Sequence, residues 1–279
     1  MRNNQSNVQE IVRWPRPKLY RLSRLVSVAL VVVSLGSLFW TPQGWLEITV
    51  DIFFRAYLMF LCTVMAHESV HGLMGKKKSV NLWWGRIVLI PATVPYVNFR
   101  KTHRMHHAHT NDPDLDPDYF AKPNRLWEIP LRVLWVPHNW IFWLKKRGKL
   151  YRADVVELVL NYVVLFVVYG SLLYFVGGER LAWGMLPSLV IVSHLLWYPF
   201  AVKTHEGFSL GAEETRSHNY YGHFMYWFTL GLSIHREHHM YQHLAWIELK
   251  QFVPPHEGQW WKTLTFKRHI IPETAPHSS

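Results

Sequence analysis

The sequence has almost no cysteine: Cys62 is the only one among 279 residues. A single thiol excludes an internal disulfide framework, and it excludes zinc or iron–sulfur sites built from cysteine thiolates. Cys62 lies within an apolar run, and no neighbour in sequence would make it a thiolate. We therefore expect a buried residue without a redox role.

Acidic residues are also scarce, with 19 Asp and Glu against 30 Lys and Arg, and the net charge is +11. Such a balance suits either nucleic acid or an anionic membrane surface. The sequence lacks a compact module of basic and aromatic residues, which argues against nucleic acid as a partner. Long apolar runs and a content of 15 Trp, 13 Tyr and 15 Phe favour the membrane.

Four apolar runs are long enough to cross a bilayer as helices. They cover residues 22–40, 46–66, 155–176 and 181–202. Residues 1–21 form a basic amino-terminal segment without a cleavage site after the first run, so we expect an anchor rather than a removed signal peptide. Residues 22–279 are then one all-α integral membrane domain.

Charged residues inside the second run need an explanation, because ionic groups are costly in a bilayer. Asp51 and Arg55 are spaced i,i+4, so they either pair with each other or lie near the membrane interface.

Three shorter apolar stretches complete the expected membrane domain. Residues 82–97 are broken by Pro91 and Pro95, which favours a re-entrant or interfacial helix. Residues 126–144 are rich in tryptophan and favour an interfacial helix that lies on the bilayer. The run 224–234 is short, and it either dips into the membrane or stays outside.

Basic residues gather on one side of the expected topology. Four spans place both termini on the same side, together with Lys76–Lys78 and the basic segment 145–149. The two turns on the other side carry only Arg180. The positive-inside rule then predicts that both termini are cytoplasmic.

Histidines form three spaced clusters, all on that same predicted side, where they make a cytosolic histidine-rich cap. The clusters are His67 and His71; His103, His106 and His107; and His235, His238 and His239. Residues three and four apart share one face of a helix, so each cluster would aim its imidazoles in one direction. Two copies of a His-x-x-His-His triplet are not expected by chance in a chain with 18 histidines.

Further histidines are weaker candidates. His205 follows the fourth span and is the best candidate for an additional ligand, with His218 and Asn219 as alternatives. His194 lies inside the fourth span, where it lines a pocket or is a satisfied polar group. His109 is expected outside the ligand shell or in solvent. The remaining histidines are not expected at a metal, namely His223, His243, His256, His269 and His277.

Carboxylates near the clusters have expected supporting roles. Glu68 and Glu237 lie inside clusters and are expected to orient imidazole N–H groups. An acidic loop follows the second cluster and contains Asp112, Asp114, Asp116 and Asp118. It lacks the glycine turn and the spaced glutamate of a calcium loop. These residues are therefore expected to belong to the loop structure or to contact the metal-ligating histidines.

Many imidazoles with few carboxylates suit iron, copper or zinc. Eight or more ligands are too many for one ion, so two non-haem irons are the economical interpretation. A di-iron centre can activate O2 and remove hydrogen from an unactivated carbon, and apolar substrates that live in bilayers contain such carbons.

The motifs HESVH, HRMHH and HREHH, in this order around four spans, resemble those of the membrane fatty acid desaturase and hydroxylase superfamily. The resemblance covers roughly residues 45–255. It implies two non-haem irons, four spans and a cytosolic cap. It also implies the eight clustered histidines as ligands, with the family's additional histidine placed at His205.

The resemblance implies oxygen-dependent desaturation of a fatty acyl chain. Hydroxylation or ketolation of a lipid, carotenoid or alkane stays open as an alternative within the superfamily. A non-catalytic membrane protein that binds metal or haem is the alternative from another class, although a haem would need axial histidines within the spans.

Neither a haem-binding His-Pro-Gly-Gly motif nor a Gly-x-Gly-x-x-Gly nucleotide fingerprint is present. Electrons are therefore expected from an external donor of the ferredoxin or cytochrome b5 type, whose acidic surface would suit the basic inside face. The chain is near the size of the bacterial members, which favours a bacterial inner membrane over the endoplasmic reticulum.

Overall fold

The computed structural model describes residues 15–122, 125–208, 217–220, 222–253 and 268–269, and its secondary structure is almost entirely helical. The α-helices are α1 Arg16–Gly36, α2 Trp45–Val70, α3 Lys78–Val88, α4 Tyr96–His109, α5 Ile129–Lys146, α6 Arg152–Val176, α7 Gly178–Ile191, α8 His223–Phe228 and α9 His235–Met240. A π-helix, η4 Val192–Val202, continues α7. The short 3-10 helices are η1 Ser37–Phe39, η2 Pro117–Ala121, η3 Leu126–Glu128, η5 Lys203–His205 and η7 Leu249–Phe252. Strand β1 Asn219–Tyr220 pairs antiparallel with β2 Arg268–His269.

Four helical segments are long and apolar enough to span a membrane, which confirms the expected all-α membrane architecture. They are Arg16–Phe39, Trp45–Val70, Arg152–Val176 and Gly178–His205. Each is longer than the run expected from hydropathy, because helical hydrogen bonding continues into polar residues beyond the apolar core. For α2 this extension matters, because it carries His67 within the last turns of the helix.

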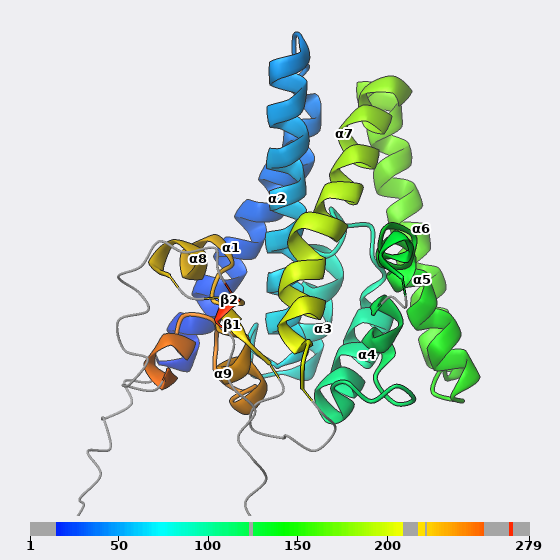
Figure 1. Ribbon diagram of the computed structural model, residues 1–279. Helices are drawn as coiled ribbons and strands as arrows, with labels where there is room; N and C mark the ends of the chain where they lie inside the picture. Colours follow the sequence, from blue (N-terminus) through cyan, green and yellow to red (C-terminus); the bar gives the residue numbers. More distant parts are fainter. Residues whose placement is uncertain (1–14, 123–124, 209–216, 221, 254–267, 270–279) are drawn as a thin grey trace, which may run out of the picture.

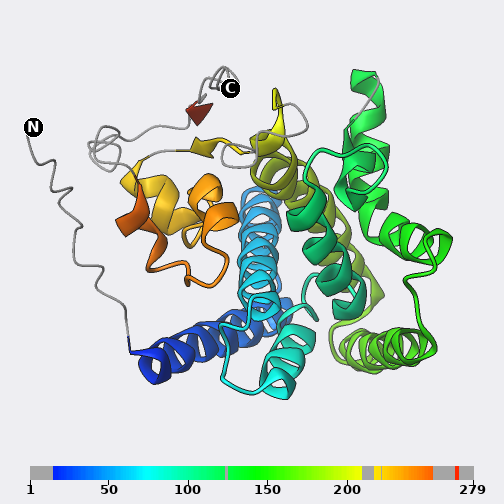
Figure 2. The ribbon, with the colours of Figure 1, turned by 90° about the horizontal axis from the view of Figure 1, so that it is seen from below.

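The spans stand side by side, and the helices that bear the other histidines gather at one end of them (Figure 1). Helices α4 and α9 lie where α2 and η5 finish. Seen along the spans, α2 packs among α1, α3 and α7 (Figure 2). These contacts fix the end of α2, and therefore His67, relative to the first and fourth spans.

The stretch between α2 and α4 differs from expectation. Residues 82–97 are not one interfacial helix: α3 ends at Val88, a turn follows, and α4 begins at Tyr96 directly after Pro95. The two prolines explain the break, because proline lacks an N–H donor and disfavours helix in the preceding residue. Thr93 in this turn has a left-handed backbone conformation, with φ at 57°.

Helix α5 confirms a helix in the tryptophan-rich segment 126–144, although it begins at Ile129 after the short η3. Leu131, Trp135 and Phe142 of this helix are exposed. Exposed large apolar side chains on a helix beside membrane spans suit contact with lipid.

The charged residues of α2 form a buried network at the end of the spans that lies opposite to the histidines. Asp51 Oδ1 lies 2.6 Å from Arg55 Nη2, and its Oδ2 lies 2.8 Å from Arg180 Nη1. Arg55 also donates to the Ser37 hydroxyl at 2.8 Å. One carboxylate therefore joins α2 to α7, and Arg55 joins α2 to η1.

We predict that Asp51→Asn destabilises the protein by about 3–5 kcal/mol, because two guanidinium groups would lose their counter-charge where the bilayer offers none. Thermal unfolding in detergent measures this effect. Glu47→Gln is the matched control on the same helix, because Glu47 accepts only an exposed hydrogen bond from the Gln43 backbone among the described contacts. Equal melting temperatures for the two variants would contradict the prediction.

Candidate metal centre

Four separate segments bring histidines to one place. His67 lies inside α2, and His71 follows as its C-terminal cap residue. Helix α4 carries the second cluster and α9 carries the third. His205 ends the 3-10 turn η5, which closes the fourth span, and it is 2% exposed. Since these segments are far apart in sequence, only the tertiary fold unites them.

The histidines form two groups, and within each group the candidate ligand atoms all lie within 4.8 Å of one another. The first group contains His67, His71, His103, His107 and His238. The second group contains His106, His205, His235 and His239. All nine histidines expected at the metal site fall into these two groups.

The alternatives to His205 make other contacts. His218 Nε2 lies 2.8 Å from the backbone carbonyl oxygen of Glu206. The Asn219 side chain donates to Glu237 at 2.6 Å and accepts from the Arg236 backbone N–H at 2.9 Å. Geometry therefore associates His205, rather than His218 or Asn219, with the clusters.

The remaining described histidines lie outside both groups. The two ring nitrogens of His194 lie 2.8 Å and 3.1 Å from the carbonyl oxygens of Val190 and Pro130, so the nitrogen that carries the proton donates to one of them. His223 Nε2 accepts a hydrogen bond from Trp227. His256 and His277 lie outside the described residues.

Nitrogen spacings in the clusters match those of shared metal ligands. His103 Nε2 lies 3.0 Å from the Nε2 atoms of both His71 and His107, and His107 Nε2 lies 3.0 Å from that of His238. Two nitrogens each about 2.1 Å from one ion lie about 3.0 Å apart at a right angle and about 3.4 Å apart at a tetrahedral angle. The observed spacings therefore leave room for an ion between the rings.

Hydrogen bonds among the rings cannot explain these contacts. A neutral imidazole nitrogen carries either a proton or a lone pair, so it makes one full hydrogen bond as donor or acceptor. His103 Nε2 and His107 Nε2 each meet two other ring nitrogens. His67 Nε2 is buried without a hydrogen-bond partner. A cation accepts lone pairs from all of these nitrogens at once, so the residues present fit a bound metal.

The second group repeats this arrangement. His205 Nε2 lies 3.1 Å from the Nε2 atoms of His106 and His235, and His239 Nε2 lies 3.2 Å from that of His235. His106 and His107 are adjacent in α4 but belong to different groups. Helix α4 therefore contributes ligand candidates to both groups, as α9 does.

The protein holds most of these rings neutral, which is the form that binds metal. Burial lowers the pKa of His71 to about 3, with Arg104 adding to the effect, and burial beside His106 lowers the pKa of His235 to about 3. Burial and neighbouring imidazoles lower the pKa well below the ordinary value for His103, His107, His238 and His239.

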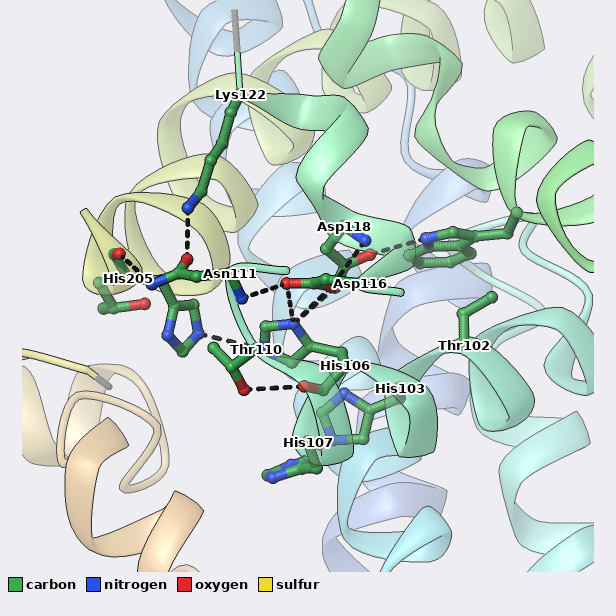
Figure 3. Close-up of polar contacts among 12 residues, drawn as sticks. Thr102, His103, His106, His107, Thr110, Asn111, Asp116, Asp118, Lys122 and His205 are labelled. Carbon is green, nitrogen blue, oxygen red and sulfur yellow. Dashed lines mark hydrogen bonds and ion pairs between the residues drawn. The ribbon is translucent and has the colours of Figure 1, made fainter. Parts of the chain in front are cut away.

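His106 is the exception, and a carboxylate explains it. Its Nδ1 lies 3.0 Å from Asp116 Oδ1, and its Nε2 faces His205 (Figure 3). Burial alone would lower the pKa of His106, but the charges and hydrogen bond of Asp116, with Asp118 beside it, raise it. A carboxylate that holds the Nδ1–H of a ligating histidine fixes its tautomer and increases its basicity. A cation at Nε2 would supply the positive charge that these carboxylates favour.

The two glutamates inside the clusters do not act as expected. Glu68 accepts a hydrogen bond from the Trp246 backbone at 3.2 Å, and Glu237 pairs with Arg236 and Asn219. These contacts tie α2 to the segment after α9, and α9 to β1, instead of orienting imidazoles. Adjacent residues on a helix point in different directions, so a glutamate next to a ligating histidine faces away from it.

Some supporting residues carried no sequence signal. Asn111 donates to the carbonyl oxygen of His205 at 2.9 Å, and Lys122 in turn donates to Asn111 (Figure 3). Trp140 donates from Nε1 to Asp118 at 2.7 Å, and the ring of Phe99 stacks on that of His103. These contacts connect distant segments, so only the folded structure reveals them.

An apolar pocket adjoins the histidines on the side of the spans. A small cavity of about 40 Å³ touches His67, His103, His106 and His235. It shares four lining residues with a larger, apolar pocket of about 200 Å³, which is lined mainly by α5, η4 and the turn between α3 and α4. The shared residues are Thr63, Phe99, Trp140 and Trp197. An apolar chain in the larger pocket would therefore reach toward the histidines.

Comparison with known proteins gives a consistent family. The family model described as fatty acid desaturase matches residues 45–266. An sn-1 acyl-lipid omega-3 desaturase (ferredoxin) of Synechocystis is 34% identical over 86 residues, which is 31% of this chain and 22% of that protein. An omega-3 fatty acid desaturase of Caenorhabditis elegans is 31% identical over 94 residues, covering 33% and 23% of the two chains.

A longer match exists at lower identity. An sn-2 palmitoyl-lipid 9-desaturase of Nostoc is 26% identical over 200 residues, or 63% of this chain and 64% of that protein. The matches to the first two relatives span only about a fifth of their length. No solved structure matches the chain.

We predict that Asp116→Asn weakens metal binding at the second group by about 10- to 100-fold, because the His106 ring loses the carboxylate that orients it. Metal analysis after dialysis against graded chelator concentrations measures this effect. Asp114→Asn is the matched control, since the Asp114 side chain is 90% exposed in the same loop. Equal metal retention by the two variants would contradict the orienting role.

Proposed function

The chain belongs to the fatty acid desaturase family, and we propose from this premise that it introduces a C=C bond into the acyl chain of a lipid, using O2. The observation that carries the proposal is the pair of neighbouring histidine groups, of five and four, beside an apolar pocket. The named relatives act on acyl lipids and fatty acids, which supports the same substrate class here.

We propose two non-haem irons as the cofactor, one for each histidine group. The ligand set fits, because imidazole suits iron and each group supplies at least four nitrogens. A reduced iron pair supplies, with O2, the oxidant that removes hydrogen from unactivated methylenes. Nine histidines are then the proposed ligands: His67, His71, His103, His106, His107, His205, His235, His238 and His239.

The residues of the chain would perform the remaining tasks. Asp116 holds Nδ1–H of His106, so its Nε2 lone pair stays directed at the centre. Phe60, Val64 and Leu232 line the small cavity with apolar surface, which would exclude water from the reacting carbons. Because Thr63 and Trp197 line both the cavity and the larger pocket, they would hold the acyl chain along its path to the histidines.

We propose that the histidine end of the spans is cytoplasmic, with both termini on that side, in a bacterial inner membrane. The excess of Lys and Arg there supports this orientation. An external electron donor of the ferredoxin or cytochrome b5 type would dock on this basic face. Exposed positive groups near the centre, such as Arg104 of α4 and Lys76–Lys78, favour a donor with an acidic surface.

Two observations weigh against the alternatives. The relatives support desaturation over hydroxylation or ketolation, since each named one is a desaturase. An axial haem ligand within the spans is disfavoured, because both ring nitrogens of His194 already meet backbone carbonyl oxygens.

We predict that expression in a host of defined lipid composition yields acyl chains that have lost two hydrogen atoms, and that His238→Ala abolishes this product. Lipid mass spectrometry measures it. His223→Ala on α8 is the control, because His223 lies outside both groups. If the ligand assignment holds, this variant retains activity. Chains that gain one oxygen atom instead would identify a hydroxylase and overturn the proposed desaturation.

We also predict that Thr63→Trp lowers turnover about 100-fold without changing metal content, because the indole would displace the acyl chain from its path. Product formation and iron content, measured on the same preparation, separate these effects. Thr49→Trp is the matched control, since Thr49 makes the same i−4 hydrogen bond on the exposed part of α2. Full activity of Thr63→Trp would exclude this path.

A further inference from the structure

A second hollow lies away from the histidines, between α3 and α6. It has a volume of about 510 Å³, which exceeds that of the pocket at the metal centre. Trp83 and Ile87 of α3 form one wall, and Val156, Leu160 and Val164 of α6 form much of the other. Arg86, Glu157 and Asn161 are its polar lining residues. The proposed reaction uses none of these groups.

The charged lining residues lie toward one end of the groove. Arg152 begins α6 at the histidine end of the spans. At 1.5 Å per residue, Glu157 lies about 8 Å along the helix axis from that start and Val164 about 18 Å. The charged pair Arg86 and Glu157 therefore lies nearer the membrane surface than Val164 and Leu165, which form the deep end of the groove. A lipid of the leaflet at the histidine end has the same polarity along its length.

The surroundings of α6 favour a lipid as the occupant of the groove. Only 6% of its most apolar window is buried within the protein, so this span lies against hydrocarbon. Val156, Leu160 and Val164 are 53%, 58% and 46% exposed. Water does not fill an apolar groove at this depth, because the bilayer core holds no water to supply it.

The charges at the polar end select the headgroup. Glu157 lies 3.0 Å from Arg86 and 3.6 Å from Arg100, so one carboxylate faces two guanidinium groups and the trio carries a net positive charge. Arg86 uses Nε and Nη2 on Glu157 and stacks on Trp83 at 5.0 Å. Among the described residues its Nη1 has no hydrogen-bond partner. Arginine binds phosphate oxygens well in such a setting.

We propose that this groove is a binding site for an anionic phospholipid, with one acyl chain against Leu160 and Val164 and the phosphate at Arg86. Negative charge on the headgroup is required to balance the trio, so phosphatidylglycerol binds more tightly than phosphatidylcholine. The site lies outside both histidine groups, and its occupancy does not depend on the proposed desaturation.

Native mass spectrometry of the delipidated, detergent-purified full chain tests the proposal, with phosphatidylglycerol or phosphatidylcholine added back. We expect one phosphatidylglycerol per chain to remain bound at concentrations where phosphatidylcholine is lost. Arg86→Gln should weaken retention about fivefold, the equivalent of one basic group acting on an anionic lipid. Leu160→Trp should also weaken it, by filling the space of the acyl chain.

Arg132→Gln is the matched control, because Arg132 of α5 is also paired with a glutamate. Its Nε lies 2.8 Å from Glu128 Oε2. This variant should retain phosphatidylglycerol like the unmodified protein. Equal retention of the two lipids would overturn the charge selection, and equal retention by Arg86→Gln and Arg132→Gln would overturn the site. If the protein forms dimers without lipid, and Leu160→Trp dissociates these dimers, then a second copy of the chain occupies the groove instead of a lipid. Melting temperatures of all variants identify any that fail to fold.

Discussion

The structure depends on one constraint: nine imidazoles, most of them buried, must stay together where they cannot satisfy each other by hydrogen bonds. Each ring nitrogen offers one lone pair or one proton, yet several meet two other nitrogens at about 3.0 Å. A metal ion bound between the rings would relieve this conflict. Three features hold the imidazoles together: the long α2, the contributions of α4 and α9 to both groups, and the turn at His205.

Much of this could be predicted from the sequence, because the relevant signals are periodic or compositional. Hydropathy indicates the four spans, and histidine spacing indicates eight of the nine residues that the structure groups. His205 was found from its position after the last span. For Asp51 and Arg55 the i,i+4 spacing left two alternatives, a mutual pair or a position near the interface, and the structure shows the pair.

The remainder depends on tertiary contacts that no local pattern encodes. Arg180 was expected only as a charge in an outer turn, yet it completes the network of Asp51 across two helices. Glu68 and Glu237 were placed by sequence proximity to histidines, but helical geometry turns them toward other partners. The sequence marks a break at Pro91 and Pro95, but it does not show that α3 ends at Val88 and that α4 begins at Tyr96.

The distribution of histidines along the chain has a consequence for biosynthesis. The group of five includes His238, and the group of four includes His235 and His239, so α9 contributes to both. Neither group is complete until the ribosome has made the chain beyond residue 239, after all four spans have been translated. Full coordination of the proposed metal ions would therefore be a late event in the life of each molecule. A chain interrupted before α9 would lack His235, His238 and His239 of the proposed ligand set.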